Sequence, residues 1–319
     1  MSAEIKPRIN LEDRTRLETV IPLSTPYLVF LDPSDICNFA CSFCPTGDNA
    51  LMSRTRQQQL LDWDLYKRII KSLCQMPEPI KTLRLYGFGE PLLNPKFADM
   101  VAYARKTQRF VQIDTTTNGS LLKPDLGQRI IEAGLDALIV SVPADYSDKY
   151  RENIKRFYRY SGGRCRVYVK VIREALDNTA AAKFLVDFKD ISDRIFIENQ
   201  VNCWPNFNAG PDGTAGIYGQ TVSSAPMICP YIFYSIMINS DGTVSSCFLD
   251  WNRSMVIGDL AQESFEAVWN GPGLRRLRLA HLLNQRSSRA SCANCKQLQY
   301  GACDNIDAHA DEVCKNLYR

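Results

Sequence analysis

An apolar run typical of a strand, followed by an amphipathic run typical of a helix, recurs about every 28 residues between Tyr27 and Asn199. We expect strands over residues 27–31, 82–88, 110–116, 137–142, 166–172 and 194–199. We expect helices over residues 63–73, 97–107, 125–133, 148–160 and 179–188. Most of these strands are apolar on both faces, which is typical of parallel βα units with a covered sheet. Six such units predict an α/β fold, namely a partial (β/α)6 barrel of the TIM type with its active-site loops at the strand carboxyl ends.

The pattern breaks after Asn199, and the chain there favours a second, smaller unit. We expect four segments: a lead-in at 1–25, the barrel at 26–200, a linker at 201–226 and a C-terminal module at 227–319. Residues 231–248 resemble two β runs joined by a turn at Asn239–Gly242, and amphipathic helices are expected at 263–269 and 274–283. Four cysteines near the C-terminus indicate that a metal organises this β-hairpin and helix module.

The cysteine content points to metal or redox chemistry rather than to disulfides. The chain has 12 cysteines among 319 residues, and its N-terminus lacks the apolar core of a signal peptide. No apolar stretch approaches the roughly 18–20 residues of a membrane span. We therefore expect a cytoplasmic protein without a membrane partner, where clustered cysteines bind metals more often than they form disulfides. A net charge of +3, without a long Lys/Arg run, gives no reason to expect a nucleic-acid partner.

The first cysteine group lies in a short loop directly after the first predicted strand. Cys37, Cys41 and Cys44 have the spacing C-x3-C-x2-C. Three thiolates leave one iron of a 4Fe–4S cluster open to an outside ligand, and soft thiolates suit either an iron–sulfur cluster or zinc. A three-cysteine zinc site and a chance group of buried cysteines are the alternatives.

With Phe43 just before its last cysteine, this loop resembles the cluster loop of the radical S-adenosylmethionine (SAM) superfamily. The resemblance covers residues 25–200, and it implies that the amino and carboxylate groups of SAM bind the unique iron. It also implies that reduction of the cluster cleaves SAM to methionine and a 5′-deoxyadenosyl radical. The partners implied are a small-molecule substrate and an electron donor such as flavodoxin or ferredoxin.

Three downstream segments at predicted strand ends fit the same family. The segment Tyr-Gly-Phe-Gly-Glu-Pro resembles its Gly-Gly-Glu-Pro motif, with Phe88 in place of the first glycine. The resemblance implies that Gly89 and Glu90 bind SAM, with the Glu90 carboxylate accepting from the ammonium group. It also implies that Asn118 contacts the ribose of SAM or the substrate, and that Ser141 contacts SAM. Each segment alone also has an ordinary interpretation as a turn or a strand end, so the prediction rests on their order.

The second cysteine group resembles the SPASM or twitch extension of radical SAM enzymes over residues 227–305. Cys229, Cys247, Cys292 and Cys295 have the spacing C-x17-C-x44-C-x2-C. The resemblance implies one auxiliary 4Fe–4S cluster held by these four cysteines, with Cys303 as an alternate ligand. A second auxiliary cluster and a structural zinc site are the alternatives.

Several further residues lie where they are expected to meet the site. Cys203 follows the sixth predicted strand beside Trp204 and is a candidate hydrogen-atom donor. Five residues on or near strand ends are candidates for substrate contact, the alternative being a solvated or salt-bridged face: Arg84, Tyr86, Lys170, Arg173 and Asn199. His281 and His309 are expected to be surface or helix residues.

The reaction follows from the two expected clusters. A fully ligated auxiliary cluster cannot bind substrate, so its natural use is to take an electron from a substrate radical or to pass electrons onward. Our first hypothesis is oxidation or epimerisation of a hydroxylated small molecule, such as a sugar, aminocyclitol or sugar nucleotide. The short lead-in argues against a peptide-recognition domain. The alternatives are modification of a ribosomal peptide or protein, by crosslinking or epimerisation, and a non-catalytic iron–sulfur or zinc protein that binds a partner.

Overall fold

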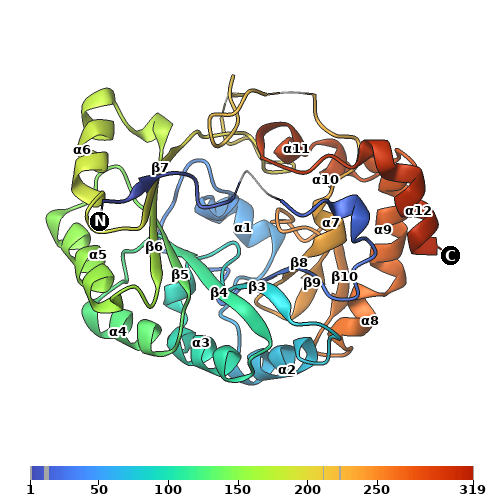
Figure 1. Ribbon diagram of the computed structural model, residues 1–319, viewed down its shortest axis with the longest axis horizontal. Helices are drawn as coiled ribbons and strands as arrows, with labels where there is room; N and C mark the ends of the chain where they lie inside the picture. Colours follow the sequence, from blue (N-terminus) through green and yellow to red (C-terminus); the bar gives the residue numbers. More distant parts are fainter. Residues whose placement is uncertain (1, 11–13, 211, 223, 319) are drawn as a thin grey trace.

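The computed structural model describes residues 2–10, 14–210, 212–222 and 224–318. Its strands form one sheet in the order β1-β7-β6-β5-β4-β3-β2-β8-β9-β10. The strands are β1 (Glu4–Ile5), β2 (Leu28–Leu31), β3 (Ile80–Arg84), β4 (Phe110–Thr117), β5 (Ala137–Ser141), β6 (Arg166–Ile172), β7 (Arg194–Glu198), β8 (Ser235–Ile238), β9 (Thr243–Ser245) and β10 (Val256–Asp259). β2 to β7 are all parallel, and the sheet curves with helices along its outer side (Figure 1). The predicted partial barrel is confirmed.

The barrel helices lie where the sequence pattern predicts them. They are α2 (Trp63–Leu73), α3 (Phe97–Lys106), α4 (Pro124–Glu132), α5 (Asp148–Ser161) and α6 (Asn178–Phe188). The Asp62 carboxylate caps α2 by accepting from Asp64 N at 2.9 Å and Leu65 N at 3.0 Å. Gly134 follows α4 with a φ of +89°, in the left-handed region that favours glycine. These helices cover the apolar outer face of the sheet, where the largest group of buried side chains lies.

The second predicted strand, 82–88, is placed too late in the chain. β3 spans Ile80–Arg84, and the residues after Leu85 leave the sheet. Phe88 N donates to Asp32 Oδ2 at 3.1 Å, so its hydrogen bond goes to a buried side chain instead of a neighbouring strand. The motif that follows is thereby directed to the mouth of the barrel.

The C-terminal module continues the sheet of the barrel. β8 pairs in parallel with β2, and β9 and β10 follow in antiparallel pairing. The predicted turn is present, because Gly242 has a φ of +87° and its N–H donates to Asn239 O at 2.9 Å. The first part of the predicted hairpin is instead the short helix α7 (Tyr231–Tyr234), and β10 was not predicted. The other helices of this region are α8 (Phe265–Trp269), α9 (Pro272–Leu282), α10 (Ala290–Ala293), α11 (Gln297–Tyr300) and α12 (Ala310–Tyr318).

The lead-in is more ordered than its sequence suggests. β1 pairs in parallel with β7 at one edge of the sheet. Further along the lead-in, Arg14 donates to Ala302 O at 2.7 Å and Asp304 Oδ2 at 2.9 Å, so the segment also contacts the C-terminal module. In Figure 1 this dark blue segment starts beside β7 and reappears near α9. Among the described residues, no helix is long and apolar enough to cross a lipid bilayer.

Candidate active site

A cavity of about 730 Å³ lies at the carboxyl ends of the barrel strands. Its wall includes residues that follow each of the strands from β2 to β7, together with Phe248 and Leu249 of the C-terminal module. This volume falls within the range of about 300–1,000 Å³ of sites that bind small molecules. The cavity is therefore the candidate active site, and it lies where a barrel of this type places one.

The first cysteine group lies on the cavity wall. Cys37, Cys41 and Cys44 all line it and are all partly exposed. Backbone hydrogen bonds shape the loop, from Cys44 N to Cys41 O at 3.1 Å and from Gly47 N to Cys44 O at 2.9 Å. A Cβ atom on Gly47 would lie 2.4 Å from Cys41 O, so only glycine fits there. Burial raises the pKa of Cys41 to about 11, and the donor set suits an iron–sulfur cluster, which binds cysteines as thiolates.

The motif that contains Gly89 and Glu90 follows β3 and packs against the start of the first cysteine loop. Glu90 N donates to Ile36 O at 2.9 Å, and a Cβ atom on Gly89 would lie 2.1 Å from Ser34 O. Glu90 is 2% exposed, and its carboxylate accepts from Thr117 Oγ1 at 2.6 Å. Burial raises the pKa of Glu90, and its hydrogen bonds from neutral donors offset this only in part. Gly89 thus lets the motif approach the cluster loop closely enough to place Glu90 on the cavity wall.

Asn118 joins the end of β4 to the first cysteine loop. Its backbone N–H donates to Glu90 Oε2 at 2.7 Å, and its Nδ2 donates to Asn38 Oδ1 at 2.9 Å and lies 4.0 Å from Cys37 Sγ. Tyr150, which the sequence did not single out, holds the Asn118 carbonyl by donating its hydroxyl at 2.7 Å. Phe43 and Ser141 also line the cavity. The structure therefore brings together all of the residues expected to bind SAM.

The second cysteine group comes from four separate positions behind the cavity wall. Cys229 precedes α7, Cys247 follows β9, and Cys292 and Cys295 lie in and just after α10. Burial raises the pKa of all four thiols, and the four lie near enough to influence one another electrostatically. The described ranges contain no group of three or more His, Cys, Asp or Glu side chains arranged for one metal ion. A 4Fe–4S cluster sets a different requirement, because each cysteine binds its own iron atom.

His281 is buried beside the second cysteine group, so it is a helix residue and not a surface one. It lies in α9 with 0% exposure, and its Nδ1 accepts from Cys229 N at 3.2 Å. Burial, followed by the nearby Arg286, lowers the pKa of His281 to about 4, so the ring is neutral. The signal available in the sequence was periodicity, because His281 falls four residues after Leu277 on the buried face of the helix.

The remaining C-terminal cysteines have other surroundings. Cys303 Sγ donates to Leu298 O at 3.4 Å, and the charges that affect its pKa come from Asp304, Arg14 and Asp307. Cys314 lies in α12 and packs against the core.

Cys203 lies on the cavity wall between the two cysteine groups. Burial is the main cause that raises its pKa to about 12, and the neighbouring Cys295 and Cys44 add to the rise. The Cys203 thiol therefore stays protonated at neutral pH.

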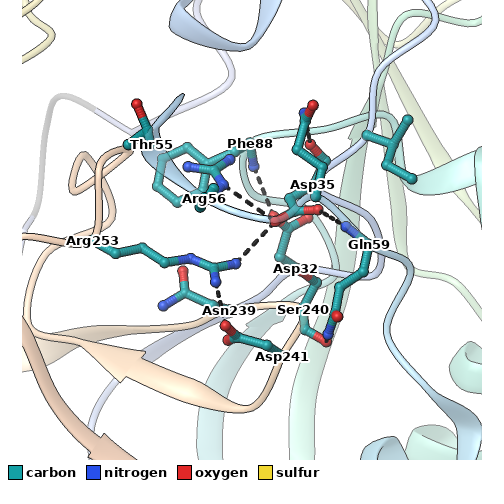
Figure 2. A network of polar contacts seen from close by, with 12 residues as sticks. Asp32, Asp35, Thr55, Arg56, Gln59, Phe88, Asn239, Ser240, Asp241 and Arg253 are labelled. Atoms are coloured by element: carbon teal, nitrogen blue, oxygen red, sulfur yellow. Dashed lines mark hydrogen bonds and ion pairs between the residues drawn. The ribbon is translucent and has the colours of Figure 1, made fainter. Parts of the chain in front are cut away.

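A buried polar network connects the first cysteine loop to the C-terminal module (Figure 2). Asp35, two residues before Cys37, accepts from Arg56 Nε at 3.2 Å and from Arg253 Nη2 at 2.9 Å. Arg253 also pairs with Asp241, and Arg56 donates to the carbonyl of Trp251. The side chain of Asp35 is 0% exposed, and those of Arg56 and Arg253 are 3% and 13% exposed. The network thus fixes the segment of the first cysteine loop against the segment that follows Cys247.

The carboxyl groups of this network differ in their partners. Asp35 and Asp241 face two guanidinium groups, and the third carboxyl in Figure 2, Asp32, makes no ion pair with a described residue. Burial raises the pKa of Asp32 to about 7, although hydrogen bonds from Phe88 and Ser34 act against the rise.

Three of the five candidate substrate contacts line the cavity, namely Arg84, Tyr86 and Lys170. Lys170 pairs with Glu198 at 2.5 Å, and Arg84 pairs with Asp114 at 3.4 Å. The side chain of Asn199 instead donates to Gly216 O at 2.8 Å, and neither it nor Arg173 is part of the cavity wall.

Comparisons with known proteins cover both parts of the chain. The model of the radical SAM superfamily matches residues 31–190, and that of the iron–sulfur cluster-binding domain SPASM matches residues 229–296. GTP 3′,8-cyclase from Pectobacterium atrosepticum is 35% identical over 117 residues, which are 36% of this chain and 34% of that protein. The chain therefore matches about a third of the length of this curated relative.

Two solved structures are similar over most of the chain. The crystal structure of BtrN in complex with AdoMet and 2-DOIA is 18% identical with a TM-score of 0.61, and covers 84% of this chain and 92% of that one. The crystal structure of Streptococcus suis SuiB bound to the precursor peptide SuiA is 12% identical with a TM-score of 0.63, over 89% of this chain and 73% of that one. Because both sequence identities are low, these two similarities show a shared fold only.

Proposed function

The chain belongs to the radical SAM superfamily, and from this premise we propose that it oxidises or epimerises a hydroxylated small molecule, such as a sugar, aminocyclitol or sugar nucleotide. Its cofactors are SAM and a 4Fe–4S cluster, and its SPASM domain adds auxiliary iron–sulfur binding. When bound, these groups supply the 5′-deoxyadenosyl radical that removes a substrate hydrogen atom. Family membership makes the protein an enzyme, so a purely partner-binding role is set aside.

The residues on the cavity wall are assigned roles in this proposal. Cys37, Cys41 and Cys44 hold the SAM-binding cluster, and Glu90 accepts from the ammonium group of SAM. Gly89 lets the motif pack against the cluster loop, while Phe43, Asn118 and Ser141 line the SAM pocket. Their positions around one cavity support the assignment, because a catalytic constellation needs its groups preset around the reacting atoms.

Oxidation is the outcome that we favour, and one observation carries it. The wall that holds Cys37 also contains Phe248 and Leu249, which directly follow Cys247 of the second cysteine group. A substrate in this cavity would lie between the two groups. It would lose a hydrogen atom on one side, an electron toward the other and its hydroxyl proton to solvent, which leaves a carbonyl. One auxiliary cluster, held by Cys229, Cys247, Cys292 and Cys295, is sufficient for this outcome.

Epimerisation has a separate observation in its favour. Cys203 lies on the same wall and its raised pKa keeps the thiol protonated, which is the form that can return a hydrogen atom. Reaction of the reduced enzyme in deuterated water separates the two outcomes. Epimerisation gives a product that contains solvent deuterium, whereas oxidation gives a carbonyl without it. If Cys203 is the donor, incorporation is lost in Cys203→Ala and is constant from about pH 7 to about pH 9, since its pKa is about 12.

Modification of a peptide is the other candidate, because SuiB has a similar fold and was crystallised with a precursor peptide. The release of 5′-deoxyadenosine in the presence of candidate sugars, aminocyclitols, sugar nucleotides and peptides tests the substrate class. A response to peptides alone would contradict the small-molecule proposal.

A further inference from the structure

One positive charge on the cavity wall has no carboxylate partner among the residues that the structure describes. The wall carries four cations, and three of them are paired: Arg14 with Asp304, Arg84 with Asp114 and Lys170 with Glu198. Arg8, the fourth, forms no ion pair within the described ranges. Its Nε is buried and finds no hydrogen-bond acceptor in the part of the chain that the structure describes. The charge of Glu198 also acts on Arg8, but Glu198 pairs with Lys170, so the half-buried Arg8 is left without a contacting anion among the described residues.

The surroundings of Arg8 concentrate positive charge around a phenol. Arg8 Nη1 donates to the hydroxyl oxygen of Tyr86 at 2.7 Å, and Arg84 Nη1 lies 3.5 Å from the same oxygen. Burial acts to raise the pKa of Tyr86, but the two guanidinium groups outweigh it and the pKa is lowered overall. Tyr218 also lines the cavity and lies near enough to Arg8 to interact with its charge. Two cations and two phenols therefore border one region of the wall.

The cavity contains a second unpaired charge of opposite sign. Glu90 accepts hydrogen bonds from neutral donors and forms no ion pair with a described residue. The proposed function assigns the cationic ammonium group of SAM to Glu90. By the same reasoning, the unpaired Arg8 indicates that a second molecule in the cavity brings an anionic group.

We propose that Arg8, Arg84 and Tyr86 bind a phosphoryl group of the substrate, which makes that substrate a phosphorylated small molecule. Guanidinium groups donate in a planar fork that matches phosphate oxygens, and a phosphoryl group offers acceptors in several directions at once. Donors that come from the lead-in and from the end of β3 match this shape better than the two coplanar oxygens of a carboxylate. This inference rests on the proposed function, and it narrows the substrate class to phosphate esters or diphosphates such as sugar phosphates and sugar nucleotides.

The proposal is tested by calorimetric titration of the reconstituted, unreduced enzyme with SAM bound. The probes are glucose 1-phosphate, inorganic pyrophosphate, glucose and acetate. We expect at least one phosphorylated probe to bind about tenfold or more tightly than both glucose and acetate. Arg8→Gln should remove most of this preference, and Arg8→Lys should keep part of it because the charge remains. Lys6→Gln, which removes the same charge from an exposed side chain in the same segment, should change nothing.

Four results would overturn the phosphoryl site. They are equal affinity for phosphorylated and neutral probes, no binding of either phosphorylated probe, acetate binding as tightly as they do, and an unchanged preference in Arg8→Gln. A loss of SAM affinity in Arg8→Gln would assign Arg8 to the cofactor instead. The proposed radical reaction is measured separately, by the release of 5′-deoxyadenosine from the reduced wild-type enzyme. The phosphoryl-site proposal and the radical-reaction proposal can therefore fail independently of each other.

Discussion

The two cysteine groups of this protein are built in opposite ways. The first occupies eight residues of one loop, Cys37 to Cys44, and lies on the wall of the cavity. The second draws four cysteines from positions between 229 and 295, and none of the four is part of that wall. Three cysteine ligands would leave one iron of a 4Fe–4S cluster open to SAM. Four cysteine ligands would leave no iron open, so such a cluster could only exchange electrons. In the proposed function, the number and the placement of the cysteines separate a site that binds a reactant from a site that carries electrons.

The supports of the two groups differ in the same way. Backbone hydrogen bonds within the loop and the close approach of Gly89 hold the first group. The second depends on packing between elements, such as His281 of α9 against the backbone of Cys229. The network around Asp35 then joins the two, so their relative position is set by buried ion pairs.

The largest expected effect comes from removal of the first group. Replacing Cys37, Cys41 and Cys44 together by Ala should abolish 5′-deoxyadenosine formation and lower the iron content from about eight to about four per chain. Chromatography of the nucleoside product and an iron assay measure both. Undiminished SAM cleavage in this variant would overturn the assignment of the loop.

Removal of the second group should separate SAM cleavage from product formation. Replacing Cys229, Cys247, Cys292 and Cys295 by Ala should again leave about four irons per chain. We expect 5′-deoxyadenosine release to persist, while formation of the oxidised product falls by about a hundredfold or more because the electron acceptor is gone. Product formation at the wild-type rate would show that the second group is structural.

Breaking the connection between the groups should have an intermediate effect. Arg253→Gln leaves Asp241 unpaired and Asp35 with one guanidinium group, and loss of a buried partner costs about 3–5 kcal/mol. We expect a lower unfolding temperature and more 5′-deoxyadenosine per product formed, since the two groups are no longer held in place. Lys296→Gln breaks the exposed pair with Asp212 and is the matched control, with a cost of at most about 1 kcal/mol. Equal behaviour of the two variants would contradict the positioning role of the network.

The smallest effect is expected at a cysteine outside both groups. Cys303→Ser should keep the full iron content and activity, because the Cys303 thiol donates to Leu298 O and its electrostatic neighbours do not include the four expected ligands. A loss of about four irons per chain would make Cys303 a ligand and change the composition of the second group.

Local patterns made much of the fold predictable. The barrel helices and most strands follow from apolar periodicity, and the Asp62 cap and the turn at Gly242 follow from residue types suited to those positions. The prediction failed where a distant side chain competes with a local preference. Tyr86 and Phe88 are typical strand residues, yet the N–H of Phe88 donates to the Asp32 carboxylate and not to a neighbouring strand.

The sequence by itself determined which residues can carry the chemistry, because the spacing of Cys37, Cys41 and Cys44 and the order of the later motifs are properties of the chain. Only the tertiary structure decided how these residues are supported and what faces them. Arg8 meets Tyr86 across 78 positions, His281 meets Cys229 across 52, and Arg253 meets Asp35 across 218. Such contacts have no local signal, since their energy comes from burial and charge pairing that exist only after the chain has folded.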